Sequence, residues 1–271
     1  MGLLSKVFDG YIKFNFHVGL AVLALVQITT LDFDFSLNIT GEFLCFTSPF
    51  LAYNFIKFHR FFLLNKEGMK TKGSPFFLGF LFLSSFLFLA VVVELPFSSQ
   101  LLLLLTLVLV LLYCLPLPGL KINFRGFRGL KIHLVALSWV LTTVFLPLSM
   151  ADKSLANGSW VYCIQRYLFV LVATLPFEIR DLKIDDPHLS TWPQKLGIRK
   201  TKMLGVILLL IFMVLEGYLV LSKDPVLTIF MLVLLMIALL ISKAEQSKYF
   251  SSFWVDGIPI LWLVLSNNPI L

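Results

Sequence analysis

The amino-acid sequence predicts an all-α integral membrane protein, with nine transmembrane helices in a single polytopic domain over residues 1–271. Hydrophobic residues make up 59% of the chain and charged residues only 14%, against about 45–50% and about 25% in soluble domains. The apolar residues form nine stretches, each close to the length of about 20 residues that crosses a hydrocarbon core. The basic residues gather on one side of the resulting topology. A soluble globule is therefore excluded, and the 28 Phe residues exclude a disordered chain.

The first four predicted spans lie in the N-terminal part of the chain, at residues 14–30, 41–64, 75–95 and 97–115. Lys6 and Lys13 precede the first span, and a basic segment that begins at Lys57 follows the second. The third and fourth spans are joined only by a tight turn around Pro96.

The other five spans are predicted at residues 129–150, 160–179, 201–221, 226–241 and 250–265. The predicted outer loops are short. Two predicted inner loops, 57–74 and 178–202, are long and charged. We therefore look for functional residues in these two segments.

The distribution of Lys and Arg supports nine spans, because cytoplasmic loops of membrane proteins collect basic residues. With the N-terminus inside, 19 of the 22 basic residues lie on the inner side, and only Lys153, Arg166 and Lys223 lie outside. One span more or fewer in the middle would move every later loop to the opposite side. We therefore expect a cytoplasmic N-terminus and an outer C-terminus, in a bacterial plasma (inner) membrane. The net charge of +7 follows from this asymmetry, and no contiguous basic domain indicates nucleic-acid binding.

The segment after span six contains four carboxylates within nine residues, Glu178, Asp181, Asp185 and Asp186. If the helix continues, the first three share one face, because they are three and four residues apart. Pro187 should end that helix. A divalent cation would relieve the repulsion among these acids, and magnesium suits a site with one or two carboxylates and substrate phosphates. The alternative is a solvated loop whose acids pair with basic neighbours in the same segment.

The segment after span two carries Asn54, Lys57 and Arg60 within two helical turns. Lys57 is one turn from Asn54 and should face the same way. Both basic side chains could simply extend to the lipid headgroups. A buried amide such as that of Asn54 needs partners, which a neighbouring helix could also supply.

At these two segments the chain resembles the UbiA superfamily of intramembrane prenyltransferases. The acidic segment IRDLKIDD, followed by WPQKLGIRKTKML, is similar to the second aspartate motif of that family and its run into helix seven. The Asp256–Gly257 pair near the ninth span also agrees. The resemblance implies a nine-helix bundle around a central cavity. It also implies that Asp181 and Asp185 are the catalytic, magnesium-binding aspartates.

The first motif of that family departs from the pattern. There, an Asn is followed by aspartates one, four and eight positions later, whereas here Asn54 is followed at those positions by Phe55, Phe58 and Phe62. Losing one acidic cluster should weaken metal binding and leave the charge of a diphosphate undercompensated. Lys57 could supply positive charge directly to a phosphate. Other inner cations could help or could merely reflect topology: Lys121, Arg125, Arg128 and Lys131.

The resemblance thus implies a UbiA-like membrane prenyltransferase homologue, which transfers a polyprenyl group from an isoprenoid diphosphate to a lipid or aromatic acceptor with Mg²⁺ as cofactor. Asp181 and Asp185 would be the catalytic metal ligands, and Asn54 and Lys57 would bind substrate on the opposite wall. The alternative is a non-catalytic isoprenoid- or partner-binding membrane protein that has lost the first metal site. A secondary transporter is disfavoured, because no span carries the paired Gly/Pro interruptions of discontinuous helices.

Overall fold

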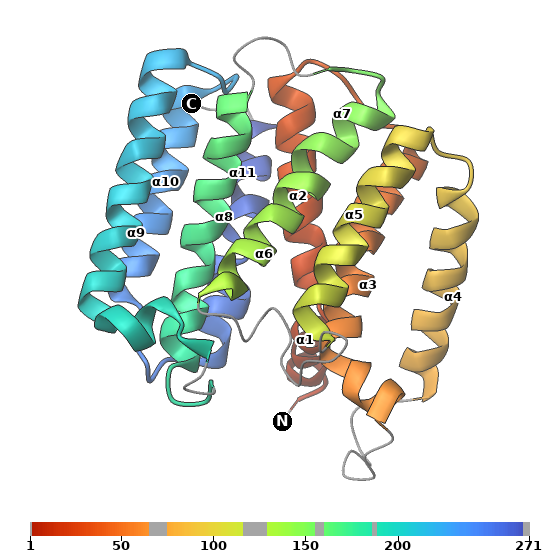
Figure 1. Cartoon of the computed structure of the whole chain (residues 1–271), viewed down its shortest axis with the longest axis horizontal. Coiled ribbons are helices and arrows are strands. Elements are labelled where there is room, and N and C mark those ends of the chain that lie inside the picture. Colours follow the sequence, from red (N-terminus) through yellow and green to blue (C-terminus); the bar gives the residue numbers. More distant parts are fainter. Residues whose placement is uncertain (1, 65–74, 116–128, 155–159, 186–188, 268–271) are drawn as a thin grey trace.

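The computed structural model describes residues 2–64, 75–115, 129–154, 160–185 and 189–267. All the regular structure in these residues is helical (Figure 1). In chain order, the helices are α1 (Leu3–Lys13), α2 (Phe16–Asp32), α3 (Ile39–Leu64), α4 (Pro75–Val92), α5 (Phe97–Cys114), α6 (Leu130–Val140), the π-helical η2 (Leu141–Phe145), α7 (Leu146–Met150), α8 (Trp160–Asp181), α9 (Trp192–Leu219), α10 (Pro225–Ile241), the π-helical η4 (Phe250–Val255) and α11 (Ile258–Ser266).

Each of the nine predicted segments coincides with one helix or with consecutive helices. Two differences concern helix starts. Helix α1 was not predicted, and it meets α2 at a bend of 62°. Helix α9 begins well before its predicted span, and the Gln194 side chain caps its N-terminus by accepting a hydrogen bond from the Thr191 backbone N–H at 2.9 Å. The chain then kinks at Gly197, whose φ of 77° a residue with a β-carbon rarely adopts.

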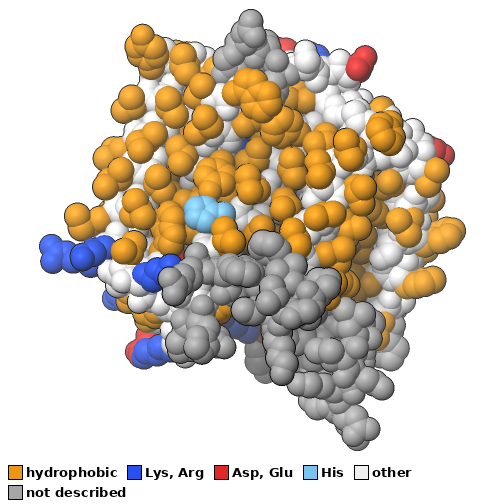
Figure 2. All heavy atoms as spheres, viewed as in Figure 1, with side chains coloured by type: hydrophobic (Ala, Val, Ile, Leu, Met, Phe, Trp, Pro, Cys, Tyr) orange, Lys and Arg blue, Asp and Glu red, His pale blue; other side chains and the backbone are white. Residues whose placement is uncertain are grey.

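The helices are apolar enough for an integral membrane protein. Four described segments, Phe97–Cys114, Leu130–Met150, Trp160–Asp181 and Trp192–Leu219, are long and apolar enough to cross a bilayer, and the bent pair α1–α2 would make five. Hydrophobic side chains cover most of the visible face, and the charged side chains that it shows lie towards its edges (Figure 2). The number of crossings, nine, and their orientation stay predictions.

Helices α2 and α8 organise the core. Helix α2 packs on α3 and α11, and α8 packs on α6 and α9. Their contact faces bury aliphatic side chains such as Leu25, Leu171 and Leu175, each with no exposed surface or almost none. Helix α4, by contrast, stands at one edge of the bundle (Figure 1) and packs mainly on α3.

The two ends of the bundle differ. We call the end that carries α1 the cavity end and the opposite end the far end. At the far end, Arg166 Nη2 donates to the Tyr162 hydroxyl at 2.6 Å, and that hydroxyl donates to Asp32 Oδ2 at 2.8 Å. Glu216, only 1% exposed, accepts from the backbone N–H of Ser222 at 3.0 Å. This polar network joins α2, α8 and α9, and its charged groups are hydrogen-bonded as burial requires.

Candidate functional site

A cavity of about 610 Å³ opens at the cavity end. Its volume lies within the range of small-ligand sites, about 300–1,000 Å³. Helices α1, α2, α3, α5, α6, α8 and η4 contribute to its wall. The polar and charged side chains that line it are Asp9, Lys13, Asn15, His17, Tyr53, Lys57, Tyr113, Lys131, Thr174, Glu178, Asp181, Lys248, Tyr249, Ser252 and Asp256.

The last turn of α8 brings two carboxylates to this cavity. Asp181 is the final residue of α8, and Glu178 lies one turn before it, so both side chains reach the same wall. Arg180 holds Asp181 by two hydrogen bonds, Nε to Oδ1 at 2.7 Å and Nη2 to Oδ2 at 3.1 Å. Glu178 is only 3% exposed, and its Oε2 atom has no hydrogen-bond partner among the described residues. The wall therefore offers one carboxylate that a guanidinium already engages and one with a spare oxygen.

Asp185 lies beyond the end of this helix. The α-helix stops at Asp181 rather than continuing to Asp185, although the backbone N–H of Asp185 still donates to the Asp181 carbonyl at 2.8 Å. The Asp185 carboxylate forms an ion pair with Lys131 Nζ at 2.6 Å, and both side chains are largely buried. Asp185 does not line the cavity, whereas its partner Lys131 does. Asp186 lies outside the described residues.

The sequence left open that the acids of this segment pair with its own basic residues, Arg180 and Lys183. The structure shows such a pair for Arg180 only. Arg180 pairs with Asp181, but Lys183 pairs with Glu245 at 2.5 Å. Both members of the second pair are exposed to solvent, and the Lys183 hydrogen bond lowers the pKa of the Glu245 carboxyl. The acidic segment is thus only partly neutralised by its own basic residues.

The structure separates the two residues predicted on the opposite wall. Lys57 lines the cavity, and its Nζ donates to the carbonyl oxygen of Lys13 at the C-terminus of α1. Asn54 is 2% exposed and does not line the cavity. Its amide donates to the Phe14 carbonyl at 2.9 Å and accepts from Asn15 Nδ2 at 3.1 Å, so a neighbouring segment satisfies it. Asn15, rather than Asn54, presents an amide to the cavity.

Aromatic rings occupy the positions where the UbiA family carries aspartates in its first motif. Phe58 is 5% exposed and packs in a cluster with Phe50 and Phe77. Phe55 faces a separate groove between α3, α4 and α5. The side chain of Phe62 lies outside the described residues. The acids of the first motif are therefore replaced by hydrophobic packing at the described positions.

Several lining residues lie far apart in the sequence. Asp256, which directly follows η4, lines the cavity, and the Asp–Gly pair was its only signal in the sequence. Lys248 Nζ donates to Asp9 Oδ1 at 2.7 Å, which ties α1 to the segment before η4. Lys131 is one of the four basic residues of the predicted inner loop between spans four and five. The other three, Lys121, Arg125 and Arg128, lie outside the described residues. Only the tertiary fold brings these charges together.

The residues that line the cavity could bind a magnesium ion only if water or a bound phosphate completed its coordination shell. Among the residues that the structure describes, no group of three His, Cys, Asp or Glu side chains could hold a metal ion. Magnesium, however, usually takes one or two carboxylates and completes its shell with water and phosphate oxygens. Glu178, with its unpartnered oxygen, and Asp181 would supply those two carboxylates from one wall.

The comparison of this chain with solved structures finds similar proteins, whereas the comparisons of its sequence find none. No protein-family model and no curated protein matches the sequence. Among solved structures, a UbiA homologue from Archaeoglobus fulgidus bound to Cd²⁺ is similar, with a TM-score of 0.61, 15% identity, and coverage of 93% of this chain and 97% of that chain. Structures of a UbiA homologue from that organism with DMAPP and Mg²⁺ and with GPP and Mg²⁺ each give a TM-score of 0.52, at 14% and 15% identity, and each covers 94% of both chains. The predicted fold class, an all-α bundle of the UbiA type, is confirmed.

Proposed function

We propose that this chain, which has the fold of the UbiA homologues, binds an isoprenoid diphosphate in the cavity. We propose further that it transfers the prenyl group to a lipid or aromatic acceptor. The observation that carries the proposal is the composition of that one cavity, where Glu178 and Asp181 share the wall with Lys57 and Lys131. Carboxylates that hold a cation and ammonium groups that contact phosphate are the two kinds of group that a magnesium diphosphate requires.

Each charged residue has a part in this proposal. Lys57 and Lys131 place positive charge at the cavity, where each would act on phosphate as a point charge. Asp185 positions Lys131 through their ion pair. Asp181 stays our proposed metal ligand, and Glu178 joins it on account of its spare oxygen. Asp185, the other proposed ligand, would have to release Lys131 before it could reach a metal in the cavity. A bound magnesium ion would neutralise the diphosphate as it leaves.

The proposed transfer balances without an oxidant or reductant. The bond between the first prenyl carbon and the diphosphate oxygen breaks, and its electron pair leaves with the diphosphate. The acceptor carbon supplies the electron pair of the new bond and then loses a proton, which the released diphosphate accepts. A bound prenyl chain and acceptor would have to exclude water from the reacting carbon, because water would otherwise capture the allylic cation.

The test is turnover by the purified chain. Protein in detergent is incubated with Mg²⁺, radiolabelled prenyl diphosphates and a panel of lipid and aromatic acceptors, and diphosphate release is measured. We expect release that Asp181→Asn abolishes. Asp152→Asn, the same chemical change at an exposed position at the far end, should leave it unchanged. Release that is equal in both variants, or no binding of any prenyl diphosphate, would refute the proposal.

A second function is favoured by a specific observation, namely the loss of the first acidic cluster. Phe58 packs in a hydrophobic cluster, and Arg180 already engages both oxygens of Asp181. A protein with these features could bind an isoprenoid diphosphate or a partner without transferring the prenyl group. Tight prenyl diphosphate binding with no release for any acceptor would identify this non-catalytic function.

A further inference from the structure

Helix α1 forms part of the cavity wall, but it is only loosely attached to the rest of the bundle. Asp9, Ile12 and Lys13 share one side of this helix and line the cavity. Helix α1 packs mainly on α2, where the Tyr11 hydroxyl and His17 Nδ1 share a hydrogen bond of 2.7 Å. None of the described side chains of α1 is buried, whereas ten residues of α2 are. Because segments with few buried contacts open more easily than the core does, α1 can leave its position while the bundle stays folded.

The C-terminal end of α1 has the properties of a hinge. It meets α2 at a bend of 62°. Asn15, at the bend, has a φ of 60°, in the left-handed region that Asn adopts more readily than most residues. Lys57 Nζ donates to the Lys13 carbonyl and fixes this end to α3. Asn54, also on α3, donates to the Phe14 carbonyl at 2.9 Å and accepts from Asn15 at 3.1 Å. A rotation of α1 about this end can leave these bonds in place.

The rest of α1 is attached by contacts near the surface to η4 and to the segment before it. Asp9 Oδ1 accepts hydrogen bonds from Lys248 Nζ at 2.7 Å and from the Tyr249 hydroxyl. The Phe8 ring lies 5.3 Å from the ring of Tyr249 and 5.1 Å from that of Phe253. The Lys248 side chain is 69% exposed, and ion pairs at such exposed positions stabilise a structure little. These contacts therefore hold α1 against the cavity only weakly.

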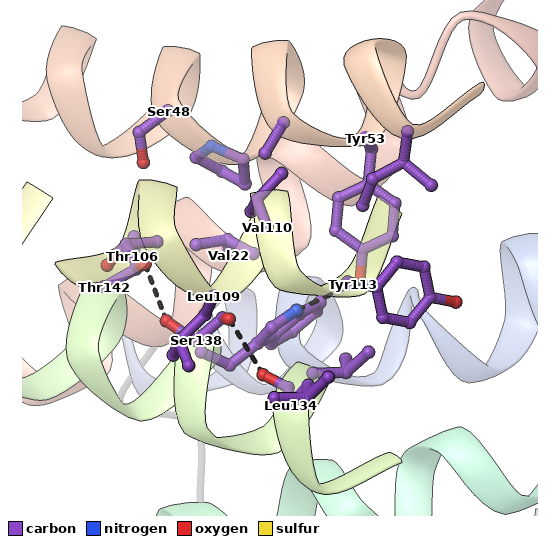
Figure 3. Close-up of a pocket in the computed structure, with 15 residues that line it drawn as sticks. Val22, Ser48, Tyr53, Thr106, Leu109, Val110, Tyr113, Leu134, Ser138 and Thr142 are labelled. Carbon is purple, nitrogen blue, oxygen red and sulfur yellow. Dashed lines mark hydrogen bonds between the residues drawn. The ribbon is translucent and has the colours of Figure 1, made fainter. Parts of the chain in front are cut away.

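The cavity has a second boundary, which separates it from a smaller hollow of about 90 Å³ (Figure 3). Tyr53, Tyr113 and Trp139 line both spaces, and Trp139 Nε1 donates to the Tyr53 hydroxyl at 3.1 Å. The hydroxyls of Ser138 and Thr142 bond to carbonyl oxygens of the preceding turn, both at 2.8 Å, so the wall of the hollow is mainly apolar. A charged ligand would lose its hydration there without gaining partners. Such a ligand would therefore enter the cavity from the side of the charged residues, which includes α1.

We propose that α1 is a lid on the cavity. It pivots where it meets α2, at Phe14 and Asn15. Its latch is the Asp9 carboxylate with its two donors, Lys248 and Tyr249. When the latch breaks, α1 swings away from η4 and opens the cavity to the solution at that end. Lys248 also lines the cavity, so an anion that binds this ammonium group competes with Asp9 and releases the lid. The inference concerns access to the cavity and holds for any charged ligand.

The test measures access to the cavity as the rate of thiol labelling. Thr174→Cys places a thiol on α8 in the cavity wall, and the native Cys45, Cys114 and Cys163 are buried. The purified full-length variant, in detergent, is treated with a charged, water-soluble thiosulfonate, with and without a second change, Asp9→Ala. We expect Asp9→Ala to raise the labelling rate of the introduced thiol about two- to fivefold, which is the range that loss of an exposed ion pair allows.

Glu245→Ala is the matched control. Glu245 also lies in the segment before η4 and forms a comparable exposed ion pair, with Lys183, but neither residue lines the cavity. This change should leave the labelling rate as it is in Thr174→Cys alone. Equal labelling rates with and without Asp9→Ala would overturn the lid, and so would an equal rise with Glu245→Ala.

Hydrogen exchange followed by mass spectrometry tests the hinge separately and does not need the introduced thiol. In the otherwise unchanged protein, Asp9→Ala should speed exchange of the backbone amides of α1 and leave those of α2 as they are. Unchanged exchange in α1 would overturn the inference. Exchange that rises equally in α1 and α2 would also overturn it, because Asp9 would then support the bundle and not a latch. Neither measurement uses a prenyl ligand, so a failure of the lid is distinguished from a failure of the proposed function.

Discussion

Removing the guanidinium of Arg180 should strengthen magnesium binding rather than weaken it. Arg180 engages both oxygens of Asp181, at 2.7 and 3.1 Å. A cation that binds this carboxylate must displace at least one of those hydrogen bonds. Arg180→Gln removes the competing charge and keeps a polar, uncharged side chain at this position, although it also loses the bond from Arg180 Nη1 to Ser252.

The size of the effect follows from the exposure of the pair. Hydrogen bonds to charged groups contribute about 1.5–3 kcal/mol when buried, and fully exposed ion pairs contribute about 0.2–1 kcal/mol. The side chains of Arg180 and Asp181 are 25% and 26% exposed, so an intermediate value of about 1–2 kcal/mol is appropriate. Releasing that interaction should raise magnesium affinity about 5- to 30-fold.

Titration calorimetry of the detergent-purified protein with MgCl₂, without prenyl ligand, measures this directly. Lys183→Gln is the matched control, because it removes one positive charge from the same segment but frees only the exposed Glu245. We expect its magnesium affinity to equal that of the wild type. An Arg180→Gln protein that binds magnesium no more tightly than the wild type would refute the reasoning that Asp181 is a metal ligand for which Arg180 competes.

Three further predictions concern stability, measured by thermal unfolding of the purified protein. Phe58→Asp restores one acid of the first motif, but it places the carboxylate in an aromatic cluster. It should therefore lower the free energy of unfolding by about 3–5 kcal/mol and add no magnesium affinity. A Phe58→Asp protein that binds magnesium more tightly would contradict this prediction. Arg166→Met should also cost about 3–5 kcal/mol, since it leaves buried carboxylates uncompensated, and an unchanged melting temperature would show that the far-end network contributes little. Gly205→Val should cost about 1–3 kcal/mol, because a β-carbon there would lie 2.4 and 2.8 Å from side chains of α10 and α8. Gly79→Ala, where nothing lies within 4 Å, should not destabilise the protein.

The positions of the helices could be predicted because long apolar runs leave the chain few alternatives in lipid. Helix α1 was missed because its 11 residues are too few to span and are amphipathic rather than uniformly apolar. The early start of α9 had a signal in Thr191 and Gln194, but the charged residues that follow concealed it from a search for apolar stretches. The π-helical turns of η2 and η4 left no mark, since one extra residue in a turn does not change hydropathy.

The site was only partly predictable, for a different physical reason. The spacing of Glu178 and Asp181 is local, so a helix was enough to place both on one wall. The ion pair of Lys131 with Asp185 joins residues on α6 and after α8, and no local pattern specifies it. Asn54 was predicted to contact substrate, but its amide is hydrogen-bonded to Phe14 and Asn15, at the bend between α1 and α2. Roles for Asp181, Asp185, Asn54 and Lys57 stay predictions that the proposed variants test.

The far-end network has a mechanical consequence. At the end remote from the cavity, the Tyr162 hydroxyl donates to Asp32 and the Gln165 amide donates to Glu216, so α8 is fastened to both α2 and α9. From Gln165 to Asp181, α8 rises by about 24 Å at 1.5 Å per residue. A tilt of about 5° around the fixed end would therefore move Asp181 by about 2 Å. Small rotations of α8 about this fixed end would thus widen or narrow the cavity, while the hydrogen bonds at the far end stay in place.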